Sequence, residues 1–187
     1  MLKKPAGRAA KDVGGTRIVI HLGNVDGGKG RRPASKSKNY AKRFPNVRFK
    51  GFDVKGLVGR RPRNLEQKKT DFLSGLEGEA DNSVEMVTSE MALGHYARKP
   101  RNIDDTLNPE RRPYTRSVIA LAYRKLMPGG RMHIAIGYVD FQPVVRMLKR
   151  AGFEVESHEL KDSRRTPWTN FYGITHQITA TKPKGKP

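Results

Sequence analysis

The feature that most constrains this chain is a continuous apolar run, TRIVIHL at residues 16–22, which ends in the glycine-rich sequence GNVDGG. A strand that is apolar on both faces is typical of the centre of a parallel sheet covered by helices on both sides. A second expected strand, at 46–52, ends on Asp53 about thirty residues after the first glycine. This arrangement is typical of α/β proteins that present a nucleotide or nucleoside site at the carboxyl ends of their strands.

The remaining sequence continues this alternation of strand and helix. The elements that we expect are strands at 16–22, 46–52, within 65–70, 84–89, 131–136, 153–160 and 173–181, and helices at 34–44, 114–127 and 141–151. Pro45 is expected to stop the first helix, and Pro128-Gly129-Gly130 the second. The pattern predicts an α/β fold with a mostly parallel sheet. A long polar connection at 94–113 is expected to be functional or disordered.

Composition sets the remaining bounds on this 187-residue chain. We expect one domain at 16–182, a basic disordered arm at 1–15 and a basic tail at 183–187. The chain has no cysteine, which excludes disulfides, a thiol nucleophile and cysteine-ligated zinc, and we expect no metal site. No apolar run approaches the roughly 20 residues of a membrane span, and the start lacks the apolar stretch of a secretory signal. We therefore expect a soluble, cytoplasmic protein without a membrane partner.

The net charge of +20 is distributed unevenly along the chain. Residues 1–70 carry a net +16, residues 71–97 a net −6 and residues 98–187 a net +10. Basic clusters fall in expected loops throughout the chain: Lys29, Arg31, Arg32, Arg60, Arg61, Arg63, Arg111, Arg112, Arg164 and Arg165. Such clusters are either solvated faces or phosphate-binding sites, and their number favours nucleic acid. Since no helix-turn-helix or zinc finger is visible, we favour RNA over DNA.

Several of these segments resemble the class I S-adenosylmethionine-dependent methyltransferases. LMPGGRMHIAI at 126–136 is similar to the family's helix-to-fifth-strand signature, LKRAGFEVESHEL at 148–160 to the following helix and strand, and DNSVEMVTS at 81–89 to the approach to the fourth strand. Asp53 and Asp71 stand where the second and third strands end. The resemblance spans 16–182 and implies a Rossmann-like sheet, mostly parallel with a last antiparallel strand, and helices on both faces.

The resemblance also implies S-adenosylmethionine as the cofactor. Its expected binding residues are Gly23, Asn24, Gly27, Asp53, Val54, Asp71, Phe72 and Ser89. An acidic residue at the end of a second strand can accept both ribose hydroxyls, the role expected for Asp53. The resemblance implies that Asp71 accepts a hydrogen bond from the adenine amino group. It also implies that Gly23 and Gly27 let the backbone lie close to the methionine portion of the cofactor. Each position has a structural alternative, because Asp also caps helices and glycine also serves turns.

The first motif departs from the family in two places. His21 stands where members usually carry an acidic residue, and Val25 where they carry a second glycine. We interpret His21 as a buried, hydrogen-bonded histidine rather than a catalytic base. The same stretch fits the phosphate-binding pattern G-x-x-x-x-G-K up to Lys29, but Gly30 replaces the hydroxyl residue that would bind magnesium.

The residues at the end of the fourth expected strand narrow the expected chemistry. TSEM at 88–91 stands in place of an N-P-P-Y-type motif, which argues against methylation of an exocyclic amine. The absence of cysteine argues against attack on a pyrimidine carbon, leaving a ring nitrogen, a ribose hydroxyl or a protein side chain. The segments ERRPYTRSVIALAYRKLMPGG, YVDFQPVVRML and TPWTNFYGITHQI are similar in outline to the guanine-N7 methyltransferases of transfer RNA, which implies a ring nitrogen. The Pro-Asp-Pro-Trp type motif of those enzymes is missing here. The catalytic residue is unknown; Glu90 and His95 are candidates, and Trp168, Phe171 and Tyr172 are candidates for stacking on a base.

Two functions therefore remain open. The first is an RNA methyltransferase acting on a ring nitrogen or ribose hydroxyl, with transfer or ribosomal RNA as its partner. The second is a catalytically inactive, methyltransferase-like RNA-binding subunit of a ribonucleoprotein or protein complex. His21 and Val25 favour the second function, whereas Asp53 and Asp71 favour the first.

Overall fold

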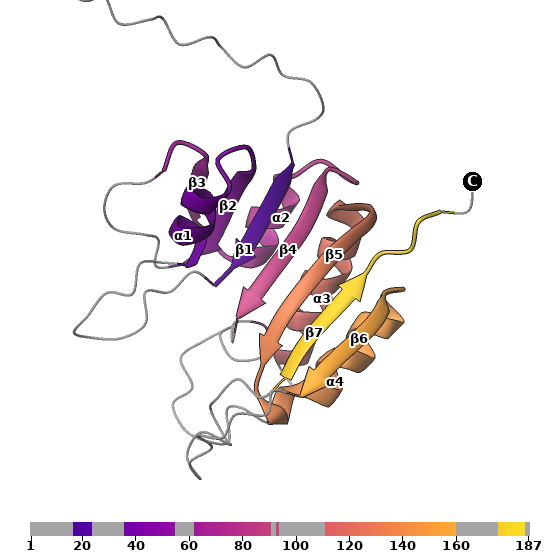
Figure 1. Cartoon of the computed structure of the whole chain (residues 1–187). Coiled ribbons are helices and arrows are strands. Elements are labelled where there is room, and N and C mark those ends of the chain that lie inside the picture. Colours follow the sequence, from indigo (N-terminus) through magenta and orange to yellow (C-terminus); the bar gives the residue numbers. More distant parts are fainter. Residues whose placement is uncertain are drawn as a thin grey trace, which may run out of the picture.

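The computed structural model describes residues 17–23, 36–54, 62–90, 93, 111–159 and 176–185. Its centre is a seven-stranded sheet in the order β3-β2-β1-β4-β5-β7-β6 (Figure 1). The strands are β1 (Ile18–Leu22), β2 (Arg48–Asp53), β3 (Leu65–Lys69), β4 (Val84–Glu90), β5 (Leu126–Ile136), β6 (Glu154–Glu159) and β7 (His176–Thr181). The helices are α1 (Lys36–Arg43), α2 (Phe72–Glu77), α3 (Arg111–Lys125) and α4 (Tyr138–Arg150).

The strand directions confirm the mixed sheet that the sequence predicts. The pairs formed by β3, β2, β1, β4 and β5 are all parallel. Strand β7 inserts between β5 and β6 and runs antiparallel to both. The carboxyl ends of the first five strands therefore meet at one edge of the sheet.

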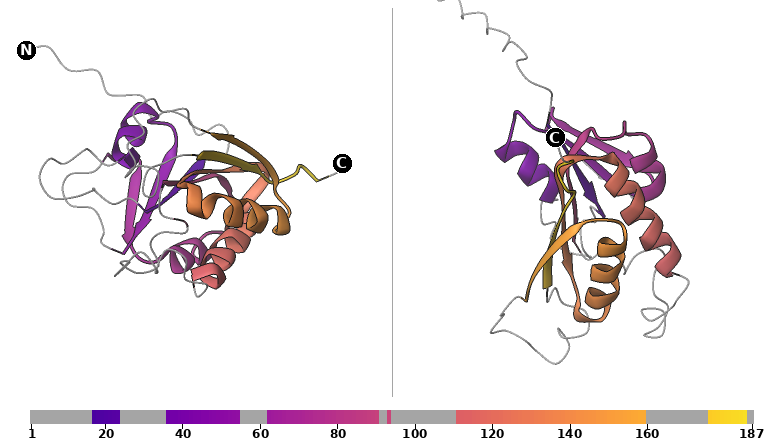
Figure 2. Two further views of the ribbon diagram at one scale, coloured as in Figure 1. Left: turned by 90° about the horizontal axis from the view of Figure 1, so that it is seen from below. Right: turned by 90° about the vertical axis from the view of Figure 1, so that its right-hand side faces the viewer.

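Helices cover both faces of the sheet, as expected, but unequally. Figure 2 shows α2, α3 and α4 on one side of the sheet and α1 on the other. The larger core lies beneath α2, α3 and α4, and a smaller cluster of Ala41, Phe49 and Leu65 lies beneath α1. Strand alternation explains this division, because successive side chains point to opposite faces. In β1, Ile20 and Leu22 enter the larger core and Val19 packs against the smaller cluster.

The carboxyl-terminal helices bury the apolar faces that their periodicity predicts. On α3, Val118 and Ala122 are buried, and on α4, Val144 and Leu148 are buried. These residues recur at the spacing that places them on one face of a helix. The amphipathic pattern thus identified both helices and the side by which each packs on the sheet.

The structure corrects the boundary between α3 and β5. The helix begins at Arg111 rather than at Tyr114, so Arg111 and Arg112 lie in its first turn and not in a loop. Strand β5 begins at Leu126, so the Pro-Gly-Gly sequence lies within the strand. The amide of Gly129 donates to the carbonyl of Lys182 at 2.9 Å, and the amide of Lys182 donates to the carbonyl of Gly130 at 2.9 Å. Pairing with β4 passes from Leu126 to Arg131 with a shift of register, and Gly129 has a φ of 78°, so the Pro-Gly-Gly sequence forms an irregularity within the strand. The expected end of the helix before Pro128 is confirmed.

Helix α2 was not predicted, because it is only six residues long and contains Gly75. Packing explains both the helix and the glycine. Phe72 and Leu76 enter the larger core, and Gly75 lies against the ring of Phe52 on β2. A Cβ atom at position 75 would lie 2.5 Å from Cδ2 of Phe52, so a larger residue would force the helix or the Phe52 ring to shift.

A buried ion pair connects β2 to the segment after α2. The ammonium of Lys50 donates to Oε1 and Oε2 of Glu79 at 2.7 and 2.5 Å, and the two residues are 8% and 6% exposed. The Coulombic attraction of such a pair offsets the cost of removing both charges from water. Removing one partner would leave the other charge buried.

We expect Glu79→Ala to lower the free energy of unfolding by about 3–5 kcal/mol, because it leaves the Lys50 ammonium buried without its carboxylate. Glu77→Ala is the matched control: Glu77 lies on α2 and is exposed, and its substitution should cost less than about 0.5 kcal/mol. Urea unfolding monitored by circular dichroism measures both. Equal stability of the two variants would show that the pair does not hold this part of the fold.

Candidate functional site

The carboxyl ends of β1, β2 and β4 form the centre of the candidate site. Leu22 pairs with Phe52 of β2 on one side and with Ser89 of β4 on the other. The chain proceeds from β1 outward through β2 and β3, then crosses to the opposite side of β1 to form β4. In open α/β sheets such a reversal of strand order leaves a crevice at the carboxyl edge where ligands bind. The last residues of these three strands are therefore adjacent.

Gly23 begins the turn that follows β1. Its φ is 79°, and its amide donates to the carbonyl of Phe52 at 3.0 Å. This is the left-handed region that favours glycine, so the backbone requires glycine at the position that the sequence singled out. The hydrogen bond holds the end of β1 close to β2.

Asp53 and the following Val54 have opposite environments. Asp53 ends β2 and is 2% exposed, whereas Val54 is 61% exposed. The sequence predicted the position of the carboxylate but not its burial. An acid at the strand end beside an exposed apolar side chain fits a ligand with both hydroxyl groups and an apolar ring.

Ser89 provides an unsatisfied polar atom near the same edge. It is fully buried, and in the described part of the chain its hydroxyl has no hydrogen-bond partner. A buried hydroxyl without a partner costs free energy unless water or a ligand satisfies it. Ser89 therefore marks a place where a bound polar group would be stabilising.

Asp71 caps helix α2. Its Oδ1 accepts from the amides of Leu73 and Ser74 at 2.9 and 3.1 Å, and its Oδ2 accepts from the hydroxyl of Ser74 at 2.6 Å. The Ser74 hydroxyl, more than the backbone amides, lowers the pKa of this carboxyl. The amide of Phe72 donates to the hydroxyl of Tyr114 at 3.1 Å, and burial raises the pKa of Tyr114. Asp71 thus has the helix-capping role that the sequence offered as an alternative to cofactor binding.

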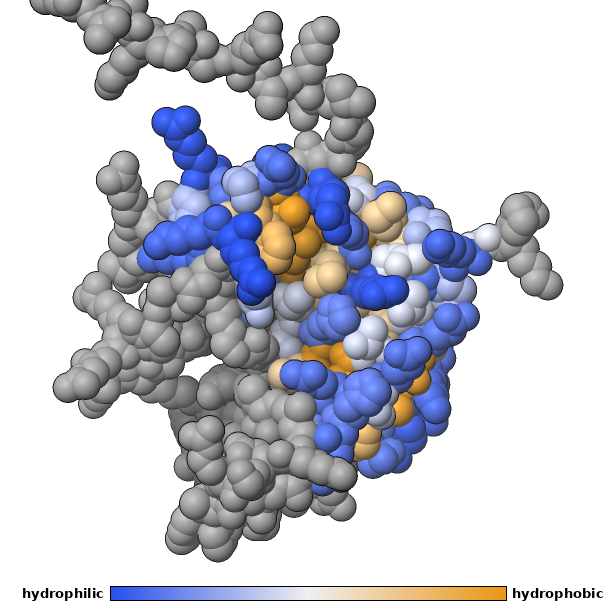
Figure 3. Space-filling view, in the orientation of Figure 1, coloured by the Kyte–Doolittle hydropathy of each residue, from blue (hydrophilic) through white to orange (hydrophobic). Residues whose placement is uncertain are grey.

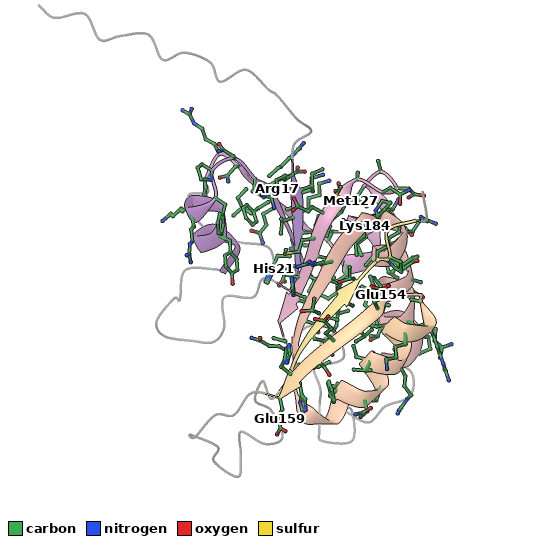
Figure 4. All side chains as sticks on the ribbon, turned by 45° about the vertical axis from the view of Figure 1, so that its right-hand side comes forward. Arg17, His21, Met127, Glu154, Glu159 and Lys184 are labelled. Atoms are coloured by element: carbon green, nitrogen blue, oxygen red, sulfur yellow. The ribbon has the colours of Figure 1, made fainter. Side chains whose placement is uncertain are left out.

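His21 is buried and hydrogen bonded, as we interpreted it from the sequence. It is 5% exposed, and its Nδ1 lies 2.6 Å from Oγ1 of Thr88 on the neighbouring strand (Figure 4). Glu90, a candidate catalytic residue, is the last residue of β4 and so lies at the carboxyl edge. The other predicted site residues lie outside the described residues: Asn24, Gly27, His95, Trp168, Phe171 and Tyr172, with Val25.

The predicted RNA-binding residues fall into two groups. Arg63 is exposed in the turn before β3, and Arg111 and Arg112 begin α3. The remainder lie outside the described residues: Lys29, Arg31, Arg32, Arg60, Arg61, Arg164 and Arg165.

The sequence did not single out Thr88, Ser74 or Tyr114 as functional. The alternation of VEMVTSE places Thr88 on the same face as Met86. Knowing that β4 pairs with β1 would have identified Thr88 as the neighbour of His21. The role of Tyr114 depends on the packing of α3 against α2, which no local pattern reports. Among the described residues, no helix is long and apolar enough to cross a membrane.

Comparison with solved structures shows which fold this is. The chain is similar to phosphoethanolamine N-methyltransferase 2 of Haemonchus contortus, with a TM-score of 0.54, 13% identity, and coverage of 92% of this chain and 50% of that one. The precorrin-6y C5,15-methyltransferase of Geobacter metallireducens matches with a TM-score of 0.58 and 16% identity, over 91% of this chain and 84% of that one. The 1,6-didemethyltoxoflavin-N1-methyltransferase of Burkholderia thailandensis matches with a TM-score of 0.57 and 14% identity, over 90% of this chain and 72% of that one. No protein-family model and no curated protein matches the chain.

At these identities the likeness concerns the fold alone. The chain has the Rossmann-like fold of the class I S-adenosylmethionine-dependent methyltransferases, as its motifs predicted. It spans half the length of the Haemonchus contortus enzyme. The Haemonchus contortus and Burkholderia thailandensis enzymes were solved with S-adenosylhomocysteine bound, and the substrates that they and the precorrin enzyme are named for differ widely.

We expect Asp71→Ala to lower the free energy of unfolding by about 1 kcal/mol at pH 7, because α2 loses its cap. The lowered pKa of Asp71 means that this contribution is complete above about pH 4, the ordinary pKa of an aspartate, and is lost as the pH falls through the folded value. Asp71→Asn, which keeps an accepting oxygen, is the control and should retain most of the stability. Urea unfolding between pH 3 and 7 tests this, and an equal loss in both variants would contradict a capping role.

Proposed function

We propose that this protein is an S-adenosylmethionine-dependent methyltransferase that acts on RNA. The observation that carries the proposal is the convergence of Gly23, Asp53 and Ser89 at the carboxyl ends of β1, β2 and β4. The fold is one that binds this cofactor in its solved neighbours, and ligands of α/β sheets bind at this edge. The net positive charge of the chain supports RNA as the substrate.

The residues at the edge fit the cofactor in chemistry as well as in position. The Asp53 carboxylate would accept the ribose hydroxyls, and the exposed side chain of Val54 would contact the adenine. The left-handed turn at Gly23 would bring backbone close to the amino-acid portion, and the Ser89 hydroxyl has no partner among the described residues. When bound, the cofactor supplies an electrophilic methyl group, and the protein's task is alignment.

RNA is supported by the charge of the chain. A net charge of +20 attracts polyanions at long range, and the basic residues occur in clusters along nearly the whole sequence. A ring nitrogen with a free lone pair needs no strong base, whereas a ribose hydroxyl must lose its proton, a task for which Glu90 is the candidate at the edge. One solved neighbour, the toxoflavin enzyme, is named an N1-methyltransferase.

A second candidate function is supported by His21. Its imidazole is engaged with Thr88 in the strand where family members usually carry an acid. A chain that had lost the cofactor would keep the sheet as a scaffold and the basic surface as an RNA-binding subunit of a larger complex. Cofactor binding separates this alternative from the first.

We expect isothermal titration calorimetry to detect binding of S-adenosylmethionine and S-adenosylhomocysteine to the wild-type protein. Asp53→Asn should weaken binding about 10- to 100-fold, since a hydrogen bond to a charged group contributes about 1.5–3 kcal/mol. Asp53→Asn preserves the volume of the buried side chain, so its fold can be verified by circular dichroism.

Asp81→Asn is the matched control. Asp81 makes an ion pair with Lys125 at 2.7 Å and lies just before β4, at the opposite edge of the sheet. Its substitution should leave cofactor affinity unchanged. Absence of any heat of binding at millimolar ligand would exclude the enzyme and favour the inactive subunit.

A further inference from the structure

In the part of the chain that the structure describes, one face of the sheet carries no helix between α1 and β6. Among the described residues, α1 is the only helix on this face, and it packs on β2 and β3. Beside it lies a cavity of about 480 Å³, within the range of ligand-binding sites. Its lining includes Tyr40 and Phe44 of α1 and the segment after it, Met86 of β4 and Gln177 of β7. Figure 3 shows apolar and polar surface side by side on this face.

The floor of the cavity carries an alternating row of imidazoles and hydroxyls. The registers of β1, β4, β5 and β7 place in one line His21, Thr88, His133 and Thr179. His21 Nδ1 lies 2.6 Å from Thr88 Oγ1, and His133 Nδ1 lies 3.1 Å from Thr179 Oγ1. At about 4.8 Å between strands the row is about 14 Å long. It offers donors and acceptors beside apolar surface, which suits planar heteroaromatic rings better than an aliphatic partner.

The wall formed by α1 is basic and carries exposed aromatic rings. Its sequence, KSKNYAKR, contains four basic residues and no acid, and no acid occurs between residues 34 and 52. Tyr40 and Phe44 are 42% and 45% exposed, and the guanidinium of Arg43 lies 5.6 Å from the centre of the Phe44 ring. The opposite border, β6, carries Glu154 and Glu156, which pair with Thr181 and Thr179 and so lie on this face of the sheet. Figure 4 labels Glu154 at one end of that strand.

We propose that single-stranded RNA lies across this open face, with its phosphates along α1 and its bases over the row of His133, Thr88 and Thr179. The charges set this orientation, because phosphates are attracted by α1 and repelled by the glutamates of β6. Aromatic side chains beside a basic groove are the common means of binding unpaired bases. The inference rests on the proposed function for its ligand class, and it places the substrate on a face of the sheet rather than only at its carboxyl edge.

Two matched double variants test the path of the phosphates. Lys42→Ala with Arg43→Ala removes two charges from the last turn of α1, and Lys149→Ala with Arg150→Ala removes the same pair from the last turn of α4, on the other side of the sheet. All four side chains are exposed, so neither change should unfold the protein. The probe is a fluorescein-labelled single-stranded RNA of mixed sequence, titrated by anisotropy over a range of salt concentrations.

The α1 variant should weaken RNA binding about tenfold and reduce the slope of log K against log salt by about 1.4, as expected for two lost contacts with single-stranded phosphates. The α4 variant should change neither. Tyr40→Ala should weaken binding about five- to tenfold through lost stacking, whereas Tyr40→Phe should retain it.

Equal effects of the α1 and α4 variants, or no effect of either, would overturn the inference and leave the proposed function standing. RNA binding along α1 by a protein that binds no S-adenosylhomocysteine in calorimetry would support the inference and exclude the proposed enzyme. Failure of the wild-type protein to bind the RNA at low salt would overturn the inference and point to a protein segment as the occupant of the cavity.

Discussion

The pairing of β1 with β2 on one side and β4 on the other is the constraint on which the rest of the structure depends. This pairing places the reversal of strand order at β1. Because β2 and β4 both run parallel to β1, all three strands end at the same edge of the sheet. The hydrogen bond from the amide of Gly23 to the carbonyl of Phe52 fixes the residue after β1 against β2. A candidate site at this edge is therefore a consequence of topology, and the side chains at positions 53 and 89 give it its chemistry.

The two faces of the sheet differ because the connections differ. The segments leading into β4, β5 and β6 supply α2, α3 and α4 to one face, where the larger core lies. On the other face α1 shields β2 and β3, and the cavity borders β1, β4, β5 and β7 beside it. The side chains on that open face are accordingly mixed in polarity, with His133 and Thr179 where a covered strand would carry aliphatic residues. The same alternation that builds the core thus gives the open face its binding groups.

Local patterns predicted most of the strands and the helices with long amphipathic faces, because Val118, Ala122, Val144 and Leu148 recur at helical spacing. Sequence reasoning predicted that α3 ends before Pro128, but not that Gly129 and Gly130 hydrogen bond with Lys182, which is distant in the sequence. It missed α2, whose existence depends on the Asp71 cap and the contact with Phe52. At the site it predicted the positions of Gly23 and Asp53, but neither the burial of Asp53 nor the unsatisfied hydroxyl of Ser89, both of which depend on packing.

The proposed function depends on the binding of S-adenosylmethionine at the carboxyl edge of the sheet. Its most direct test is a two-dimensional ¹H–¹⁵N NMR spectrum of the full chain, recorded during titration with S-adenosylhomocysteine. The account predicts that the amide signals of Gly23, Val54 and Glu90 shift, while those of Gly129 and Lys182 at the opposite edge do not. Shifts confined to the opposite edge, or no shifts at saturating ligand, would contradict it.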